Sequence, residues 1–271
     1  MSVVPKLMGI VNVTPDSFSD GGQYFDAHVA IEHGKRLAAE GAAILDIGGE
    51  STRPGAEIVP IEEEILRVTA VIKALADEVS TPISVDTRKP EVARAAVEAG
   101  ATIWNDVSAL TFAADSVKVA SELQCGLVLM HAMGTPKTMQ LAPSYDDVVG
   151  DVSVYLRERV DACLAAGIER EKILIDPGIG FGKTLEHNIA LLKSLQDLRD
   201  IAPVLLGASR KSFIGKIDQS PMAQLASDRL GGSIATAIAA MRQGVEVLRV
   251  HDVAETRQAL KVWAKIEKCS D

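Results

Sequence analysis

The chain has 271 residues, of which 47% are hydrophobic and only 4% aromatic, and its 28 Lys and Arg against 37 Asp and Glu give a formal net charge of −9. This length permits a sizeable core without disulfides or metals, and the scarcity of aromatic residues leaves aliphatic side chains to fill it, as is typical of α/β proteins. The acidic balance argues against nucleic acid or an anionic membrane surface as the main partner.

Short apolar segments rich in β-branched residues recur along the chain, and each precedes a segment with helical periodicity. Eight strands are predicted, at Leu7–Val13, Ala43–Gly48, Pro82–Asp86, Thr102–Val107, Gly126–His131, Ile173–Asp176, Pro203–Ala208 and Val245–Val250. Helices are predicted to begin near Ala27, Ile61, Pro90, Ala114, Tyr145, Leu185, Met222 and Val253. Eight strand–helix units in this length favour a (β/α)₈ TIM barrel over a doubly wound open sheet, which would use five or six.

The chain shows no internal boundary. It contains no linker rich in Pro, Ser or Gly and no low-complexity segment, so the sequence predicts one domain that spans residues 1–271. The fold class expected is therefore α/β, with a single (β/α)₈ barrel.

Cysteine usage and the first residues indicate where the protein resides. Cys125, Cys163 and Cys269 are odd in number, widely spaced and outside any Cys-x-x-Cys pair, which argues against a disulfide framework or a thiolate metal site. The first residues lack the features of a signal peptide, and no apolar stretch approaches the roughly 20 residues needed to span a membrane. A cytoplasmic protein with no membrane partner is expected.

Polar residues gather at the carboxyl ends of the predicted strands, where barrels of this kind place their catalytic groups. Asn12 ends the first strand, and its amide can act as a neutral oxygen ligand. The second strand runs into Gly48–Gly55, where glycines permit close backbone approach and Arg53 offers a planar fork for a carboxylate or phosphate. A structural glycine turn with a surface arginine is the alternative for this segment.

Acidic and amide side chains end three further strands. Asp86, Asn105 and Asp176 each follow an apolar run, and burying such groups without partners is costly. Any one of them alone is best explained as a helix cap or a salt bridge. Together at one barrel mouth, they can accept hydrogen bonds from a flat heterocycle that carries several N–H donors.

Cations end the last two strands. Arg210 and Lys211 are adjacent, which indicates an anionic or electron-rich ligand that relieves their repulsion. Arg249 and His251 are two residues apart at the end of the final strand, so their side chains are expected on the same side of it. With Arg53 they form a candidate clamp for a diphosphate. His131, at the end of the fifth strand, is interpreted as a satisfied core histidine.

Five segments together closely resemble the dihydropteroate synthases of bacterial folate biosynthesis, over about Met8 to Glu255. They are Met8–Gly22, Gly48–Gly55, Asp176–Lys183, Ser209–Lys211 and Arg249–Asp252. The resemblance implies a (β/α)₈ barrel that joins 6-hydroxymethyl-7,8-dihydropterin diphosphate to p-aminobenzoate, releasing diphosphate with the help of Mg²⁺. It also implies a homodimer, for which Ile234, Ile238 and Met241 are the first surface to inspect, and inhibition by sulfonamides that compete with p-aminobenzoate. A role in the core explains these three residues equally well.

The resemblance also implies roles for individual residues. The pterin would be bound by Asp86, Asn105, Asp176 and Lys211, and the diphosphate by Asn12, Arg53, Arg249 and His251, with Asn12 also linked to the metal. The p-aminobenzoate pocket would comprise Thr52, Arg53, Pro54, Phe181 and Ser209, and the catalytic set would be Asp176, Lys211, Arg249 and His251. We expect a dissociative loss of diphosphate followed by attack of the amine.

One departure and two alternatives accompany this interpretation. The family commonly has Met directly after the position of His131, whereas this chain has Ala132 and then Met133, so the role of Met133 is open. A pterin-dependent methyltransferase that passes a methyl group from methyltetrahydrofolate to a corrinoid protein is one alternative. A pterin-binding paralogue without activity is the other.

Overall fold

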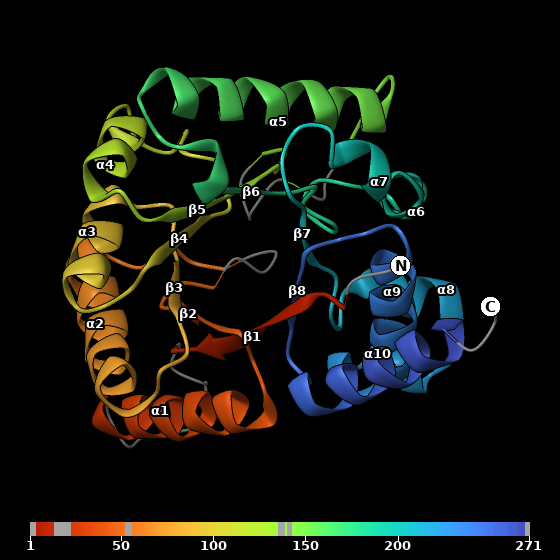
Figure 1. Ribbon diagram of the computed structural model, residues 1–271, viewed down its shortest axis with the longest axis horizontal. Coiled ribbons are helices and arrows are strands. Elements are labelled where there is room, and N and C mark those ends of the chain that lie inside the picture. Colours follow the sequence, from red (N-terminus) through yellow and green to blue (C-terminus); the bar gives the residue numbers. More distant parts are fainter. Residues whose placement is uncertain (1–3, 14–22, 52–55, 135–138, 140–142, 269–271) are drawn as a thin grey trace.

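The computed structural model describes residues 4–13, 23–51, 56–134, 139 and 143–268, and within them a ring of parallel strands is surrounded by helices (Figure 1). The strands are β1 (Lys6–Asn12), β2 (Ile44–Gly48), β3 (Ile83–Asp86), β4 (Ile103–Asp106), β5 (Gly126–Met130), β6 (Ile173–Asp176), β7 (Leu205–Gly207) and β8 (Val247–Val250). The α-helices are α1 (Gln23–Glu40), α2 (Ile61–Glu78), α3 (Pro90–Glu98), α4 (Ser116–Leu123), α5 (Val148–Ala165), α6 (Leu185–Lys193), α7 (Leu195–Leu198), α8 (Ser212–Asp218), α9 (Leu230–Arg242) and α10 (Val253–Lys268).

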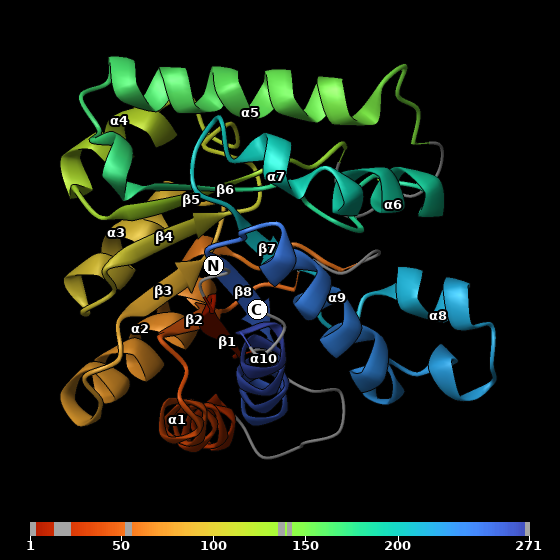
Figure 2. The ribbon, with the colours of Figure 1, turned by 45° about the vertical axis from the view of Figure 1, so that its right-hand side comes forward.

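The strands close into a barrel. Each strand pairs in parallel with its neighbours in the order β6-β5-β4-β3-β2-β1-β8-β7. The remaining gap is joined by a bridge between Ile175 and Val204, beside which the Ile175 N–H donates to the Pro203 carbonyl at 3.0 Å. Helices cover the outside all the way round, as the two views together show (Figure 2). The predicted (β/α)₈ barrel is therefore confirmed.

Helix positions differ from the prediction in several places; α1 begins at Gln23 rather than near Ala27, and α8 is not among the predicted helices. The fifth helix begins at Val148 rather than near Tyr145, because the Asp147 side chain caps it by accepting from the Val149 N–H at 3.2 Å. The helix expected near Met222 is only a 3₁₀ turn, and the long helix α9 begins at Leu230. Helix α8 itself ends at Asp218, where Gln219 takes a left-handed C-cap conformation with φ +58°.

The barrel interior is layered. Inward side chains of alternate strands form one apolar layer, which consists of Ile44, Ile103, Leu174 and Val247, and the other strands add Met8, Val128 and Leu205. Two residues further along β2, β4, β6 and β8 stand Asp46, Asn105, Asp176 and Arg249. Because side chains alternate along a strand, these four also point inward and form a polar layer. The interior therefore changes from apolar to polar between one layer of side chains and the next.

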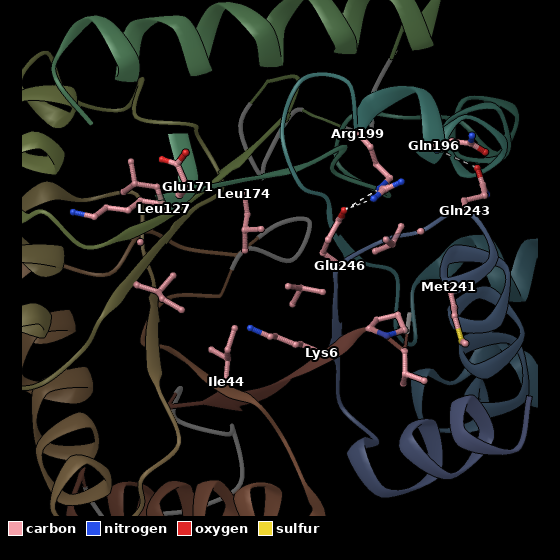
Figure 3. A pocket seen from close by; sticks show the side chains of 18 of the residues that line it. Lys6, Ile44, Leu127, Glu171, Leu174, Gln196, Arg199, Met241, Gln243 and Glu246 are labelled. Carbon is pink, nitrogen blue, oxygen red and sulfur yellow. Dashed lines mark hydrogen bonds and ion pairs between the residues drawn. The ribbon is translucent and has the colours of Figure 1, made fainter. Parts of the chain in front are cut away.

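A cavity of about 960 Å³ lies at the other end of the barrel, where the strands begin (Figure 3). Lys6, Ile44 and Val247 line it, and they are the first residues of β1, β2 and β8. The apolar layers separate this cavity from the polar layer. It is therefore distinct from the end at which the sequence predicts the active site.

The structure also bears on the predicted dimer surface, on the cysteines and on membrane-spanning helices. Met241 is fully buried in the core and Ile238 packs against the core, so the core role holds for Met241, which cannot contribute to an outer dimer surface. Cys125 and Cys163 are buried free thiols, whereas Cys269 lies outside the described residues. Among the described helices, none combines the length and apolar character needed to cross a membrane.

Candidate active site

Arg249 joins two buried carboxylates. Its Nε donates to Asp46 Oδ2 at 2.6 Å and its Nη2 donates to Asp86 Oδ2 at 2.7 Å, while Asn105 Nδ2 donates to the same Asp46 oxygen at 3.1 Å. The Oδ1 atoms of Asp46 and Asp86 are buried and have no hydrogen-bond partner within the described part of the chain. Since buried acceptors are normally satisfied, these two oxygens are available to N–H donors of a ligand.

The ionisation of Asp86 reflects this setting. The pKa of Asp86 is raised to about 7, mainly by burial; the Arg249 guanidinium opposes the rise and the neighbouring Asp46 carboxylate adds to it. The carboxyl group therefore exchanges its proton in the physiological range, close to the polar layer.

We expect this carboxyl group to make stability depend on pH. Because its folded-state pKa of about 7 exceeds the ordinary 3.8, the folded protein binds more protons than the unfolded chain between these values, and the free energy of unfolding falls as pH rises through that window. Asp86→Asn lacks this contribution. Urea unfolding at both ends of the window measures the change, and an equal fall in both proteins would contradict the expectation.

Asp176 and Lys211 are two further charged groups of the site, and each affects the pKa of the other. Asp176 Oδ1 accepts from the Gly178 N–H at 2.7 Å. Burial raises the pKa of Asp176, and Lys211 is the first group to oppose that rise. Burial also lowers the pKa of Lys211 to about 8, with Asp176 acting in the opposite direction. The Lys211 ammonium donates to the Ile179 carbonyl and lies 4.5 Å from the centroid of the Phe181 ring.

Ser209 and His251 meet at the ends of β7 and β8. The His251 N–H donates to Ser209 Oγ at 3.3 Å, and its ring Nδ1 lies 3.1 Å from the same oxygen. Arg249, on β8, and His251, just after it, therefore engage different partners. The expectation that Arg210 and Lys211 serve one ligand together is wrong for Arg210, because its guanidinium forms a two-bond ion pair with Asp252.

His131 is buried, as predicted for a core histidine, but it has an unexpected partner. Lys183 Nζ lies 2.9 Å from His131 Nδ1, and the His131 ring packs edge-on against Tyr155 with 4.9 Å between ring centroids. Burial lowers the pKa of His131 to about 3 and that of Lys183 to about 7. The histidine is thus neutral at physiological pH.

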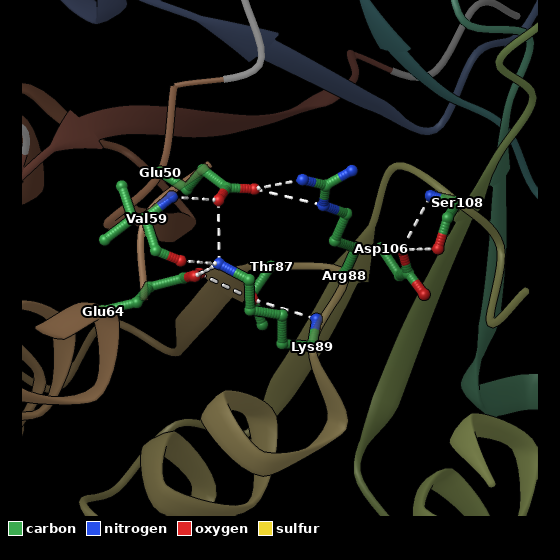
Figure 4. A network of polar contacts seen from close by, with 8 residues as sticks. All are labelled: Glu50, Val59, Glu64, Thr87, Arg88, Lys89, Asp106 and Ser108. Atoms are coloured by element: carbon green, nitrogen blue, oxygen red, sulfur yellow. Dashed lines mark hydrogen bonds and ion pairs between the residues drawn. The ribbon is translucent and has the colours of Figure 1, made fainter. Parts of the chain in front are cut away.

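A buried ion network lies at the base of the loop after β2 (Figure 4). Lys89 Nζ donates to Glu50 at 2.8 Å, to Glu64 at 2.5 Å and to the Val59 carbonyl at 2.7 Å. Glu50 in turn accepts from the Val59 N–H at 2.8 Å and pairs with Arg88 at 3.0 Å. Glu50 and Val59 flank the segment that contains residues 52–55, so the network ties together the two ends of that loop.

Some predicted site residues lie outside the described part of the chain. These are Thr52, Arg53 and Pro54 of the p-aminobenzoate set, together with most of the polar loop after Asn12. Asn12 itself is described, exposed at the end of β1. Among the described residues, no group of three or more His, Cys, Asp or Glu side chains is arranged to hold a metal ion.

The structure adds two residues that sequence reasoning did not select. Asp46 shares Arg249 with Asp86, and Lys183 is bound to His131. The signal for Asp46 was a carboxylate inside an apolar strand. The signal for Lys183 was weaker, because a lysine after a glycine-rich turn is usually exposed to solvent.

The comparisons with known proteins agree with this geometry. The family model described as pterin binding enzyme matches residues 8–251. The dihydropteroate synthase of Escherichia coli K12 is 48% identical over 260 residues, which cover 95% of this chain and 90% of that protein.

Solved structures give the same result. The Xanthomonas albilineans dihydropteroate synthase with 4-aminobenzoic acid is 50% identical, with a TM-score of 0.90 over 97% of this chain and 93% of that chain. The Yersinia pestis dihydropteroate synthase in complex with a sulfonamide drug is 42% identical, with a TM-score of 0.89 over 98% and 94% of the two chains. The chain therefore belongs to the pterin-binding enzyme family and, within it, to the dihydropteroate synthases.

Proposed function

We propose that this chain condenses 6-hydroxymethyl-7,8-dihydropterin diphosphate with p-aminobenzoate to give 7,8-dihydropteroate and diphosphate, as a transferase of folate biosynthesis. The observation that carries the proposal is the polar layer, in which the unpartnered oxygens of Asp46 and Asp86 accompany Asp176 and Lys211. Such acceptors suit a heterocycle with several N–H groups. Relatives at 48% identity that bear the synthase name favour this reaction over methyl transfer or an inactive paralogue.

The pterin assignment follows from the donors and acceptors present. Asp86 and Asp176 would accept from ring and amino N–H groups, and Asn105 retains its amide oxygen as an acceptor because its Nδ2 is engaged with Asp46. The carboxylate of Asp176 would also stabilise positive charge that develops on the ring when the C–O bond breaks. Lys211 would donate to the ring from beside Phe181.

The bond-breaking step needs stabilisation of the leaving group. The electron pair of the C–O bond leaves with the diphosphate, the electron-rich ring shares the positive charge, and the amine of p-aminobenzoate then attacks the carbon and loses a proton. His251 and Arg53 would bind the diphosphate. Arg249 would contribute positive charge while it stays paired with Asp46 and Asp86. Ser209 and Phe181 would border the p-aminobenzoate pocket together with Thr52 and Pro54.

Mg²⁺ is the cofactor that we propose. The described residues fit it only in part, because the amide oxygen of Asn12 is a suitable hard ligand while no acidic cluster accompanies it. This fits Mg²⁺, which usually keeps several waters and binds through few protein ligands plus substrate phosphates. When bound, the ion would neutralise charge on the diphosphate.

We expect removal of divalent cations to slow the reaction strongly. EDTA should lower diphosphate release and excess Mg²⁺ should restore it, and Asn12→Ala should raise the Mg²⁺ concentration required for half-maximal rate. A rate that does not respond to EDTA would contradict the assignment of Mg²⁺.

We expect sulfonamides to compete with p-aminobenzoate. A competitive pattern in initial rates, with KM for p-aminobenzoate raised and kcat unchanged, is the expected result. Support comes from the Yersinia pestis relative, which has been solved with a sulfonamide drug. Undiminished turnover at high sulfonamide and low p-aminobenzoate would refute this expectation.

We also propose that the protein is a cytoplasmic homodimer. Support for the dimer comes from the family resemblance and from Val262 and Ile266, which leave apolar side chains exposed on α10. Light scattering should give twice the mass of one chain.

A further inference from the structure

Lys183 is a nearly fully buried lysine that the proposed reaction does not use. Its side chain is 1% exposed. The ammonium donates to His131 Nδ1 at 2.9 Å, to the Phe181 carbonyl at 3.0 Å and to the His131 carbonyl at 3.4 Å. These acceptors come from two segments, the residue after β5 and the loop after β6, so one ammonium ties the two together.

The loop after β6 packs directly on the backbone that follows β5. Gly178 has φ +68°, and a Cβ there would collide with the His131 carbonyl oxygen. Gly182 has φ +63°, and a Cβ there would lie 2.6 Å from the Met133 carbonyl oxygen. Both positions therefore require glycine. The Tyr145 hydroxyl adds a hydrogen bond to the Gly182 carbonyl at 2.9 Å.

The same loop holds the ammonium of Lys211. The Ile179 carbonyl accepts from Lys211 Nζ, and the ring of Phe181 lies beneath that ammonium. Lys183 thus bonds to the carbonyl of the very residue whose ring contacts Lys211. A shift of this loop would move both the acceptor and the ring.

We propose that Lys183, held by His131, is a positioning residue for the synthase reaction, which fixes the loop after β6 and, through it, the ammonium of Lys211. The inference rests on the proposed function. Lys183 itself need not touch either substrate.

The alternative is that Lys183 only stabilises the fold, and a second buried lysine separates the two roles. Lys89 is 2% exposed and forms ion pairs with Glu50 and Glu64, so its removal strands two buried carboxylates. Lys183 has only neutral acceptors among the described residues within hydrogen-bond distance. Removing Lys183 leaves neutral acceptors without a donor, which costs less than stranding buried charges.

The experiment compares Lys183→Met and Lys89→Met with the wild type by calorimetry and steady-state kinetics. For Lys183→Met we expect a Tm lowered less than in Lys89→Met and a kcat lower by about 100-fold, the scale of a displaced catalytic group. KM for either substrate should change by less than about threefold, since binding groups are retained. Lys89→Met should show the larger fall in Tm, because it strands two buried carboxylates.

The following results separate the positioning role of Lys183 from the proposed function. A kcat of Lys183→Met close to that of the wild type, or a loss of activity that merely follows a loss of Tm, overturns the positioning role while the proposed function stands. A wild type that forms no dihydropteroate overturns both. Should Lys183→Met not fold, His131→Phe keeps the ring and removes the acceptor, and a kcat equal to that of the wild type then overturns the inference. His131→Asn, which restores an acceptor, should recover part of the lost rate.

Discussion

Replacing Arg249 by methionine is expected to lower the free energy of unfolding by about 3–5 kcal/mol at neutral pH, the usual cost of removing one partner of a buried ion pair. Two carboxylates depend on this guanidinium. The side chains of Asp46 and Asp86 are 0% and 10% exposed, and both of their bonded oxygens face Arg249 at 2.6–2.7 Å. The variant should also lose turnover, because the acceptors proposed for the pterin would change their protonation.

The stability effect has an internal control. Arg249→Met combined with Asp46→Asn and Asp86→Asn removes the stranded charges, so most of the lost stability should return while activity stays absent. Urea unfolding with a common slope measures both variants. If Arg249→Met alone is as stable as the wild type, the carboxylates do not need the guanidinium, and the described network is contradicted.

Asp176→Asn and Lys211→Ala are each expected to lose at least about 2 kcal/mol of transition-state stabilisation, the scale of a removed charge-assisted contact. Asp176 is buried and bonded to the Gly178 N–H, so the asparagine variant keeps its volume and loses only the charge that would stabilise a cationic ring. Lys211→Ala removes the donor beside Phe181. The loss should appear in kcat/KM for the pterin substrate.

Lys6→Ala is the matched control for these variants. It removes a lysine that lines the cavity at the opposite end of the barrel, beyond the apolar layers. Its kcat/KM should stay close to that of the wild type. Near wild-type kinetics for Asp176→Asn or Lys211→Ala would contradict the assignment of the pterin pocket.

The strands were predictable because their signal is local. A parallel strand buried on both faces is a short aliphatic run, and eight such runs are distinct in this chain. The helix predicted near Met222 is wrong because a helical pattern of residues does not reveal that the helical turn after Pro221 ends within three residues. The inward position of Asp86, Asn105, Asp176 and Arg249 followed from strand ends and alternation.

Partner choice was not predictable in the same way. Arg210 and Lys211 are equivalent in sequence, yet a backbone φ of +60° at Arg210 accompanies its pairing with Asp252, while Lys211 reaches the polar layer. Lys183 and His131 are 52 residues apart in sequence, and only the closeness of two loops brings them together. Contacts of this kind depend on tertiary geometry, which a single sequence does not encode in a readable pattern.

The central claim is tested most directly by measuring diphosphate and 7,8-dihydropteroate in the same reaction of the purified wild type. The account predicts that the two products form in equal amounts, that formation requires both the pterin diphosphate and p-aminobenzoate, and that Asp176→Asn lowers both together. Diphosphate release without dihydropteroate, or methyl transfer from methyltetrahydrofolate to a corrinoid protein in place of condensation, would contradict it.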